Sequence, residues 1–193
     1  MTDVSGLVLA AGAGHRMGQP KAELIVDGER LIDRAVRVLR GGGCDEVVAV
    51  LRDEVVNPDA RVVVNPEPER GMGSSLRLAL GAATGRRAVI LLVDTPGIGS
   101  EAVRAVLAAD APVVVATYRG RRGHPVVVDR AWWAEVAELA AGDRGARPFL
   151  AAHPELVREI ECPGDPSDLD TIGDLTTWRH EHSDVGTCAN RPS

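Results

Sequence analysis

The sequence is poor in cysteine and has no long hydrophobic run. Its three cysteines, Cys44, Cys162 and Cys188, are odd in number and widely spaced, which fits a reducing compartment and shows no zinc-site spacing. No stretch reaches the length of a membrane span, and the first residues, MTDVSG, lack the basic and apolar regions of a signal peptide. We therefore expect a cytoplasmic protein.

An excess of positive charge is also missing. The formal net charge is -6 at pH 7, whereas proteins that bind nucleic acid or membrane surfaces in general need surplus basic charge. We expect neither partner. The 193 residues are 45% hydrophobic, which suffices for one substantial core. We expect a single domain over residues 1–182 and a disordered tail over residues 183–193, because the tail has no hydrophobic periodicity.

The chain is organised around its opening stretch, residues 4–21. A short apolar run of β-forming residues leads directly into a loop that holds Gly12 and Gly14 and two basic residues, Arg16 and Lys21. Glycine lets the backbone adopt positive φ and approach a ligand closely, so that several N–H groups converge on one anion. The guanidinium and the ammonium add full positive charge. This composition predicts a site for a phosphate chain.

The spacing of these glycines excludes two familiar phosphate loops. The Rossmann fingerprint needs glycine at its first, third and sixth positions, and the sixth position counted from Gly12 is Met17. The Walker pattern needs Gly-Lys followed by Ser or Thr, whereas Gly18 is followed by Gln-Pro-Lys. Because the residue before proline is pushed out of the α region, the following helix is delayed. The loop therefore belongs to a different class.

The rest of the chain alternates between strand and helix patterns. Apolar runs of strand length indicate strands that are buried on both faces of a parallel sheet, and amphipathic segments separate them. This alternation predicts an α/β fold, a three-layer α/β/α sandwich around a mostly parallel sheet of Rossmann-like type. Strands are expected at 46–51, 61–64, 88–93 and 113–117, and helices at 31–40, 74–83, 100–109, 130–141 and 172–182. Ligands of such sheets bind beyond the carboxyl ends of the strands.

The opening loop also carries a recognisable signature, L-A-A/G-G-x-x-x-R-M-G-x-x-K. The matching residues are Leu9, Ala10, Ala11, Gly12, Arg16, Met17, Gly18 and Lys21. The stretch resembles the MobA-like NTP transferases, nucleotidyltransferases with a nucleotide-diphospho-sugar transferase fold that attach a nucleotide to molybdopterin. The alternative is a glycine-rich turn that only packs.

The resemblance implies a set of nucleotide-binding residues. The opening loop would contribute Leu9, Ala10, Ala11, Gly12, Gly14, Arg16 and Lys21, and the segment after the strand at 61–64 would contribute Asn65, Gly73 and Ser75. This second segment resembles the G-M-G-x-S-L motif that lies beside the nucleotide in the family. A serine there also suits a helix N-cap, and that alternative stays open.

Asp94 is the most conspicuous polar residue of the chain, because it directly follows the very apolar run AVILLV. Such a carboxylate is costly unless its charge is used, and a divalent cation such as Mg²⁺ binds through carboxylate oxygens. The segment resembles the C-D-M-P motif of the family and keeps Asp94 and Pro96. A turn-initiating aspartate is the alternative reading.

A second carboxylate for this metal comes from the segment DLDT at 168–171. It resembles the D-I-D-T-P-E-D-L motif, and by family position Asp170 is the second metal ligand, with Asp168 as the alternative. In an extended segment both project to the same side. Asp170 or Thr171 also suits the N-cap of the helix at 172–182, and the two roles are compatible.

An acceptor side is implied by two further motifs. The basic segment YRGRRGHP resembles the G-x-P segment near the acceptor and offers Arg122 and His124, although a solvated hairpin tip would look alike. The sequence GDRGAR resembles a motif of the branch that makes molybdopterin cytosine dinucleotide, and from it Arg147 is carried over as a phosphate contact. Helix ending and capping account for Gly142 and Asp143.

Together these motifs predict transfer of a nucleotidyl group from an NTP to molybdopterin or a similar phosphate acceptor, with release of pyrophosphate. Lys21, Arg16 and Asp94 would be catalytic, and Mg²⁺ would bind Asp94 and Asp170. Ala11, with the GDRGAR segment, favours CTP over GTP, and a molybdoenzyme would receive the product. The alternatives are a related transferase for a sugar-phosphate or phospholactate acceptor and a non-catalytic chaperone that binds nucleotide or cofactor.

Overall fold

The computed structural model describes residues 3–12, 14, 17–54 and 59–182. The strands are β1 (Val4–Ala10), β2 (Ile25–Val26), β3 (Glu29–Arg30), β4 (Glu46–Leu51), β5 (Arg61–Val64), β6 (Arg87–Leu92), β7 (Val113–Tyr118), β8 (Arg121–Asp129) and β9 (Val157–Glu161). The α-helices are α1 (Leu31–Gly42), α2 (Met72–Ala82), α3 (Ser100–Leu107), α4 (Trp133–Leu139), α5 (Arg147–Ala152) and α6 (Ile172–His182). Short 3-10 turns are η1 (Lys21–Glu23), η2 (Pro68–Arg70), η3 (Arg130–Trp132), η4 (Gly142–Arg144) and η5 (Pro154–Leu156).

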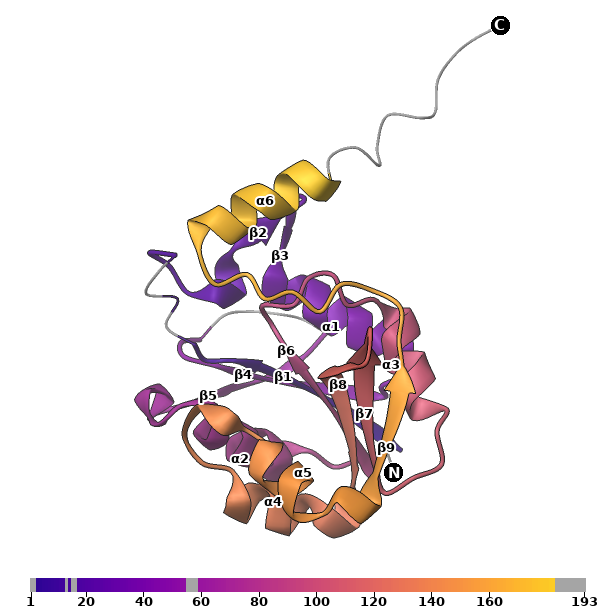
Figure 1. The fold of residues 1–193 in the computed structure, drawn as a ribbon. Coiled ribbons are helices and arrows are strands. Elements are labelled where there is room, and N and C mark those ends of the chain that lie inside the picture. The colour runs from indigo at the N-terminus through magenta and orange to yellow at the C-terminus, as the bar shows by residue number, and fades with distance from the viewer. Residues whose placement is uncertain (1–2, 13, 15–16, 55–58, 183–193) are drawn as a thin grey trace, which may run out of the picture.

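Seven strands form one sheet in the order β5-β4-β1-β6-β8-β7-β9 (Figure 1). All neighbours pair in parallel except β8, which runs antiparallel to both β6 and β7. β1 lies in the interior of the sheet, with β4 on one side and β6 on the other. The predicted three-layer α/β/α fold with a mostly parallel sheet is confirmed.

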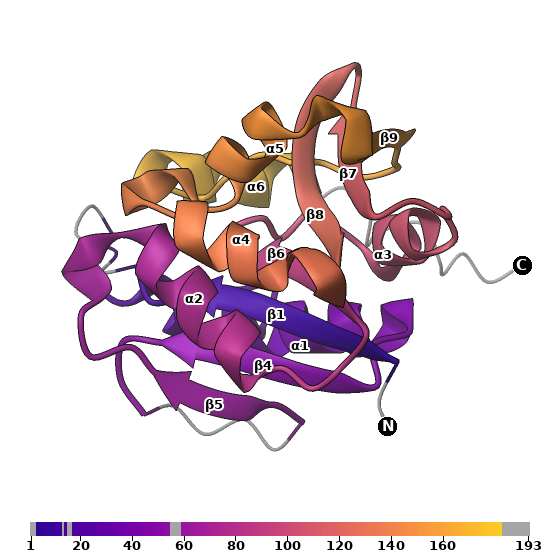
Figure 2. The same ribbon diagram turned by 90° about the horizontal axis from the view of Figure 1, so that it is seen from below.

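Side chains that alternate along the strands build a separate apolar layer on each face. On β1, Leu7 and Leu9 pack into the layer under α2, α4 and α5, whereas Val8 and Ala10 pack into the layer under α1 and α3. The two views show these helix groups on opposite faces of the sheet (Figures 1 and 2). Helix α6 lies over the small β2–β3 hairpin. Both faces of the sheet are therefore covered, as the near-continuous apolar strands require.

The observed elements differ from the expected ones in several places. The second helix begins at Met72 rather than at residue 74, so its two serines lie inside the first turn instead of at the N-cap. The helix expected over 130–141 is divided into η3 and the short α4, which ends at Leu139. Strand β9 was not expected, because its exposed face makes it less apolar than the other strands. The predicted tail, residues 183–193, lies outside the described residues. Among the described residues, no helix is long and apolar enough to cross a membrane.

Candidate active site

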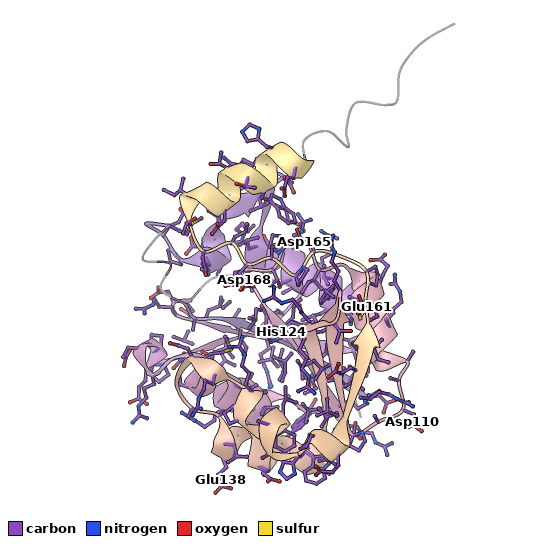
Figure 3. All side chains as sticks on the ribbon, viewed as in Figure 1. Asp110, His124, Glu138, Glu161, Asp165 and Asp168 are labelled. Carbon is purple, nitrogen blue, oxygen red and sulfur yellow. The ribbon has the colours of Figure 1, made fainter. Side chains whose placement is uncertain are left out.

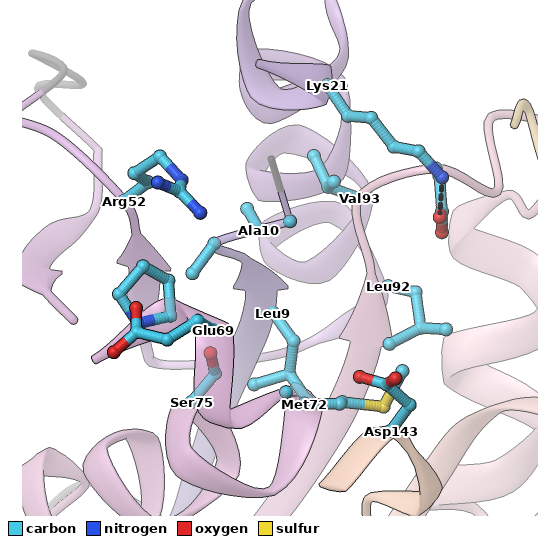
Figure 4. Close-up of a pocket in the computed structure, with 15 residues that line it drawn as sticks. Leu9, Ala10, Lys21, Arg52, Glu69, Met72, Ser75, Leu92, Val93 and Asp143 are labelled. Carbon is cyan, nitrogen blue, oxygen red and sulfur yellow. Dashed lines mark hydrogen bonds and ion pairs between the residues drawn. The ribbon is translucent and has the colours of Figure 1, made fainter. Parts of the chain in front are cut away.

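The carboxyl ends of β1, β4 and β6 and the connection from β5 to α2 surround a cavity of about 300 Å³ (Figure 4). This is the edge of the sheet at which the parallel-strand rule places a ligand. Residues from these strand ends, from η1, η2 and η4 and from the start of α2 line it: Leu9, Ala10, Ala11, Gly12, Lys21, Arg52, Pro68, Glu69, Gly71, Met72, Ser75, Leu92, Val93, Asp94 and Asp143.

Lys21 joins two carboxylates at one side of this cavity. Its Nζ donates to Asp94 Oδ2 at 2.7 Å and also contacts Asp170 Oδ1. Burial by itself lowers the pKa of Lys21, but the two carboxylates outweigh that effect, and the pKa lies above its ordinary value. The ammonium therefore stays charged, and the three side chains, far apart in the sequence, meet at one point.

The backbone explains why these side chains meet. Lys21 begins η1, and Asp94 lies just beyond the end of β6, at the edge of the sheet. The N–H of Leu169 donates to the carbonyl of Asp94 at 2.8 Å, which ties the segment before α6 to the end of β6. Thr171 caps α6, since its Oγ1 accepts the N–H of Asp174 at 3.1 Å. The capping alternative is thus confirmed for Thr171, while Asp170 is left to face Lys21.

The chemistry of this group fits a hard divalent cation. Asp94 Oδ1 is buried and has no hydrogen-bond partner within the described residues, so an oxygen ligand is available beside Asp170. Partial burial, reinforced by the Asp94 and Asp170 carboxylates, raises the pKa of Asp168 to about 6, so this third carboxyl lies in the same electrostatic environment. No group of three or more His, Cys, Asp or Glu residues suited to a metal occurs in the described part of the chain.

Asn65 and Ser75 form a unit in which only the serine reaches the cavity. The buried Asn65 donates from Nδ2 to Ser74 Oγ at 2.8 Å and to Ser75 Oγ at 3.0 Å, and its Oδ1 accepts the N–H of Glu67 at 2.9 Å. The amide thereby holds the start of α2. Since the N-cap of α2 is Gly71, the capping alternative for Ser75 is wrong, and Ser75 Oγ lies at the cavity wall.

Two of the predicted nucleotide-binding glycines have packing roles. Gly14 adopts φ 58°, and a Cβ there would lie 2.0 Å from the Gln19 carbonyl oxygen, so the loop closes only around glycine. A Cβ on Gly73 would lie 2.9 Å from the backbone of Ala140 and Ala141, so this residue lets α2 approach the start of η4. Neither residue lines the cavity, and Arg16 lies outside the described residues.

The predicted acceptor residues are only partly brought together. Burial lowers the pKa of His124 to about 4; the Asp94 carboxylate opposes this shift and the Arg147 guanidinium adds to it. His124, labelled in Figure 3, is therefore a neutral group whose charged surroundings include Asp94, rather than part of a cationic cluster. Arg122 Nε instead donates to Glu159 at 2.7 Å, with both side chains about half exposed.

The comparisons with known proteins identify the family. The family model for the MobA-like NTP transferase domain matches residues 6–157. The chain belongs to this family. The chain is 38% identical to nicotine blue oxidoreductase of Paenarthrobacter nicotinovorans, covering 88% of this chain and 93% of that protein. It is 40% identical to a probable molybdenum cofactor guanylyltransferase of Opitutus terrae, over 49% of this chain and 50% of that protein.

A solved structure extends the likeness to the whole fold. The crystal structure of Rv0371c from Mycobacterium tuberculosis H37Rv matches with a TM-score of 0.81 and 29% identity, covering 92% of this chain and 97% of that one. The complex of Rv0371c with manganese matches with a TM-score of 0.77 and 26% identity.

Several residues of this MobA-like site escaped the sequence reasoning. Arg52 follows the end of β4 just as Asp94 follows the end of β6, so position at a strand end was the available signal. Glu69 lies shortly before the G-M-G-x-S-L motif and lines the cavity together with Met72 of that motif. Asp143 was assigned to a helix cap, which is wrong: the N-cap of α5 is Ala146, and Asp143 lies in η4 at the cavity.

Proposed function

We propose that this MobA-like protein, acting as one domain in the cytoplasm, transfers a nucleoside monophosphate from an NTP to a phosphate group of molybdopterin or a similar acceptor. The observation that carries the proposal is the contact of Lys21 with both Asp94 and Asp170, beside an unpaired buried Asp94 oxygen and next to a cavity. Phosphoryl-group chemistry needs positive charge held in place where phosphate oxygens bind.

Asp94 and Asp170 would hold a divalent ion, Mg²⁺ or Mn²⁺, and the manganese complex of Rv0371c supports this choice of metal class. When bound, such an ion neutralises negative charge on phosphate oxygens. Lys21 supplies a further fixed positive charge on the triphosphate, and Arg16 is proposed to do the same. Residues 9–12 lie where β1 passes into the opening loop and line the cavity. They would hold the nucleotide against the end of β1.

On the acceptor side, Arg147 provides the cation and His124 a neutral hydrogen-bonding group. Their electrostatic environment includes Asp94, so an acceptor phosphate bound there lies beside the metal end of the site. A phosphate monoester is already largely ionised near neutral pH and needs no strong base, which suits a neutral His124. Arg122, held by Glu159, would take part after leaving that ion pair. A molybdoenzyme would then receive the product.

The proposal also specifies which NTP is the substrate. Ala11 and the GDRGAR segment favour CTP, whereas relatives named as guanylyltransferases favour GTP. The decisive experiment measures pyrophosphate release from CTP and from GTP, with Mg²⁺ or Mn²⁺ and purified molybdopterin. We expect faster release with CTP. A clear preference for GTP would refute cytidylyl transfer but not nucleotidyl transfer.

Matched variants test the chemistry itself. Asp94→Asn should lower the rate of pyrophosphate release at least about a hundredfold, because it removes a metal ligand and the partner of Lys21. Asp110→Asn removes an exposed carboxylate elsewhere on the protein and should leave the rate unchanged. If pyrophosphate is released with sugar phosphates or phospholactate but not with molybdopterin, the acceptor is one of those compounds instead. Nucleotide binding without release under any of these conditions would indicate a chaperone.

A second candidate is oxidoreductase chemistry, favoured by 38% identity to nicotine blue oxidoreductase over 88% of the chain. The same protein preparation should be tested for oxidation of NADH in the presence of nicotine blue, followed by absorbance. Turnover in that assay without pyrophosphate release in the other would replace the transferase proposal.

A further inference from the structure

Arg52 is a charged residue at the cavity with no assigned role. It follows Leu51, the last residue of β4, and lines the cavity. Its Nε is buried, yet it has no hydrogen-bond partner within the described residues. A buried guanidinium nitrogen without an acceptor is unfavourable, so this atom is expected to meet an acceptor when the cavity is filled.

Glu69 provides the opposite charge on the same wall. Figure 4 shows Arg52 and Glu69 on one side of the cavity and Lys21 on the other. In the described part of the chain Glu69 has no hydrogen bond or ion pair, whereas its neighbours Glu67 and Arg70 pair with each other at 3.0 Å. The cavity wall thus presents one free donor group and one free acceptor group.

The order of the strands separates this wall from the metal end of the site. β1 lies between β4 and β6, with Leu51 paired to Ala10 and Leu92 paired to Leu9. Two strand spacings place the ends of β4 and β6 about 10 Å apart. If the triphosphate lies at Asp94, the part of the nucleotide farthest from it, the base, lies at Arg52. This step rests on the proposed function.

The hydrogen-bonding capacity of the two side chains selects among bases. Arginine only donates and an ionised glutamate only accepts. Cytosine, guanine and adenine each carry an exocyclic amino group and at least one acceptor atom on the same edge, whereas uracil lacks the amino group. We propose that Arg52 and Glu69 read this edge, Arg52 donating to the base's acceptor atoms and Glu69 accepting from its amino group. Arg52 is therefore a specificity residue for a base that carries an amino group, which in the proposed function is cytosine or guanine.

Calorimetric titration of the whole protein with CTP, UTP, GTP and ITP, in the presence of Mg²⁺, tests this assignment. The wild-type protein should prefer CTP over UTP if the base is cytosine, or GTP over ITP if it is guanine, because the second member of each pair lacks the amino group. Arg52→Met should weaken binding of the preferred NTP about tenfold or more, as expected for loss of a two-point contact to a base. Glu69→Gln should reduce the preference within the pair.

Inorganic tripolyphosphate, which has no base, separates base contacts from phosphate contacts. Arg52→Met should leave its affinity unchanged, and equal weakening of tripolyphosphate and NTP would overturn the proposal. Arg52→Lys keeps the charge but not the planar fork, so it should also lose selectivity. Arg70→Met and Glu67→Gln are matched controls outside the cavity and should bind as wild type. If the wild type releases pyrophosphate while Arg52→Met binds and selects normally, this inference fails and the proposed function stands.

Discussion

At the scale of single residues, the site depends on Lys21, which is the sole lysine among 193 residues. Its ammonium contacts both carboxylates that are proposed to bind the metal. Two like charges can share a small volume only when a cation lies between them. Lys21 supplies that cation in the free protein, and a divalent ion must compete with it for the same oxygens.

We therefore predict that Lys21→Met binds Mn²⁺ more tightly than the wild type does in the absence of nucleotide. Removing one positive charge in direct contact with Asp94 should strengthen binding of the cation about tenfold or more, that is, by about 1.4 kcal/mol. Titration of Mn²⁺ followed by electron paramagnetic resonance measures this affinity. The double variant Lys21→Met with Asp94→Asn should lose the gain. Equal Mn²⁺ affinity of wild type and Lys21→Met would show that Lys21 and the metal do not compete.

At the scale of elements, the cavity is shaped by the close approach of α2 to η4. Gly73 lies against the backbone of Ala140 and Ala141, and Arg77 Nη1 of α2 donates to the Ala140 carbonyl at 2.5 Å. Because η4 carries Asp143 and α2 carries Ser75, this contact sets the distance between two walls of the cavity. The packing of two short elements is thus directly linked to the binding site.

Gly73→Ala should destabilise the protein by about 1–3 kcal/mol, because the new methyl group would lie only 2.9 Å from backbone atoms that cannot rotate away. Gly81→Ala, in the same helix, is the matched control. A Cβ there has no atom within 4 Å, so alanine should stabilise the helix by about 0.5–1 kcal/mol. Urea unfolding gives both free energies. Equal stability of the two variants would contradict the observed contact between α2 and η4.

At the scale of the whole molecule, Glu46 ties together the opposite edge of the sheet, far from the cavity. Its Oε1 accepts from Ser5 Oγ at 2.5 Å on β1, and from the N–H and Oγ1 of Thr84 at 2.6 and 2.8 Å before β6. Burial by itself raises the pKa of Glu46, but these hydrogen bonds outweigh it, so the pKa lies below its ordinary value. One carboxylate thus joins the amino ends of three neighbouring strands.

Because the folded-state pKa of Glu46 is lowered, its contribution to stability is present above the unfolded value near 4.5 and is lost as the pH falls through the folded value. Glu46→Gln should cost about 1–2 kcal/mol at pH 7, from weaker hydrogen bonds. The difference from wild type should shrink below about pH 4.5. Urea unfolding at a series of pH values measures it, with the exposed Glu138→Gln as control. A difference independent of pH would contradict this role.

The α/β alternation, the apolar strands and the family signature around Lys21 can all be recognised in the sequence. These are local properties: a strand buried on both faces must be continuously apolar, and a loop that holds phosphate needs glycine and basic residues at close spacing. Asp94 could be found for the same reason, since a carboxylate at the end of a very apolar strand needs a use. The family followed from these motifs, and the match over residues 6–157 confirms it.

Several residues of the cavity could be identified only from the tertiary structure. Strand order places Arg52 and Asp94 on opposite sides of β1, and no spacing in the sequence records that order. Burial keeps His124 neutral. The side chain of Asn65 is buried and donates to Ser75. Asp143 lies at the cavity wall instead of capping a helix. The sequence patterns also did not predict that β8 runs antiparallel to β6 and β7. Each outcome depends on contacts between segments far apart in the chain, and local sequence patterns carry no information about such contacts.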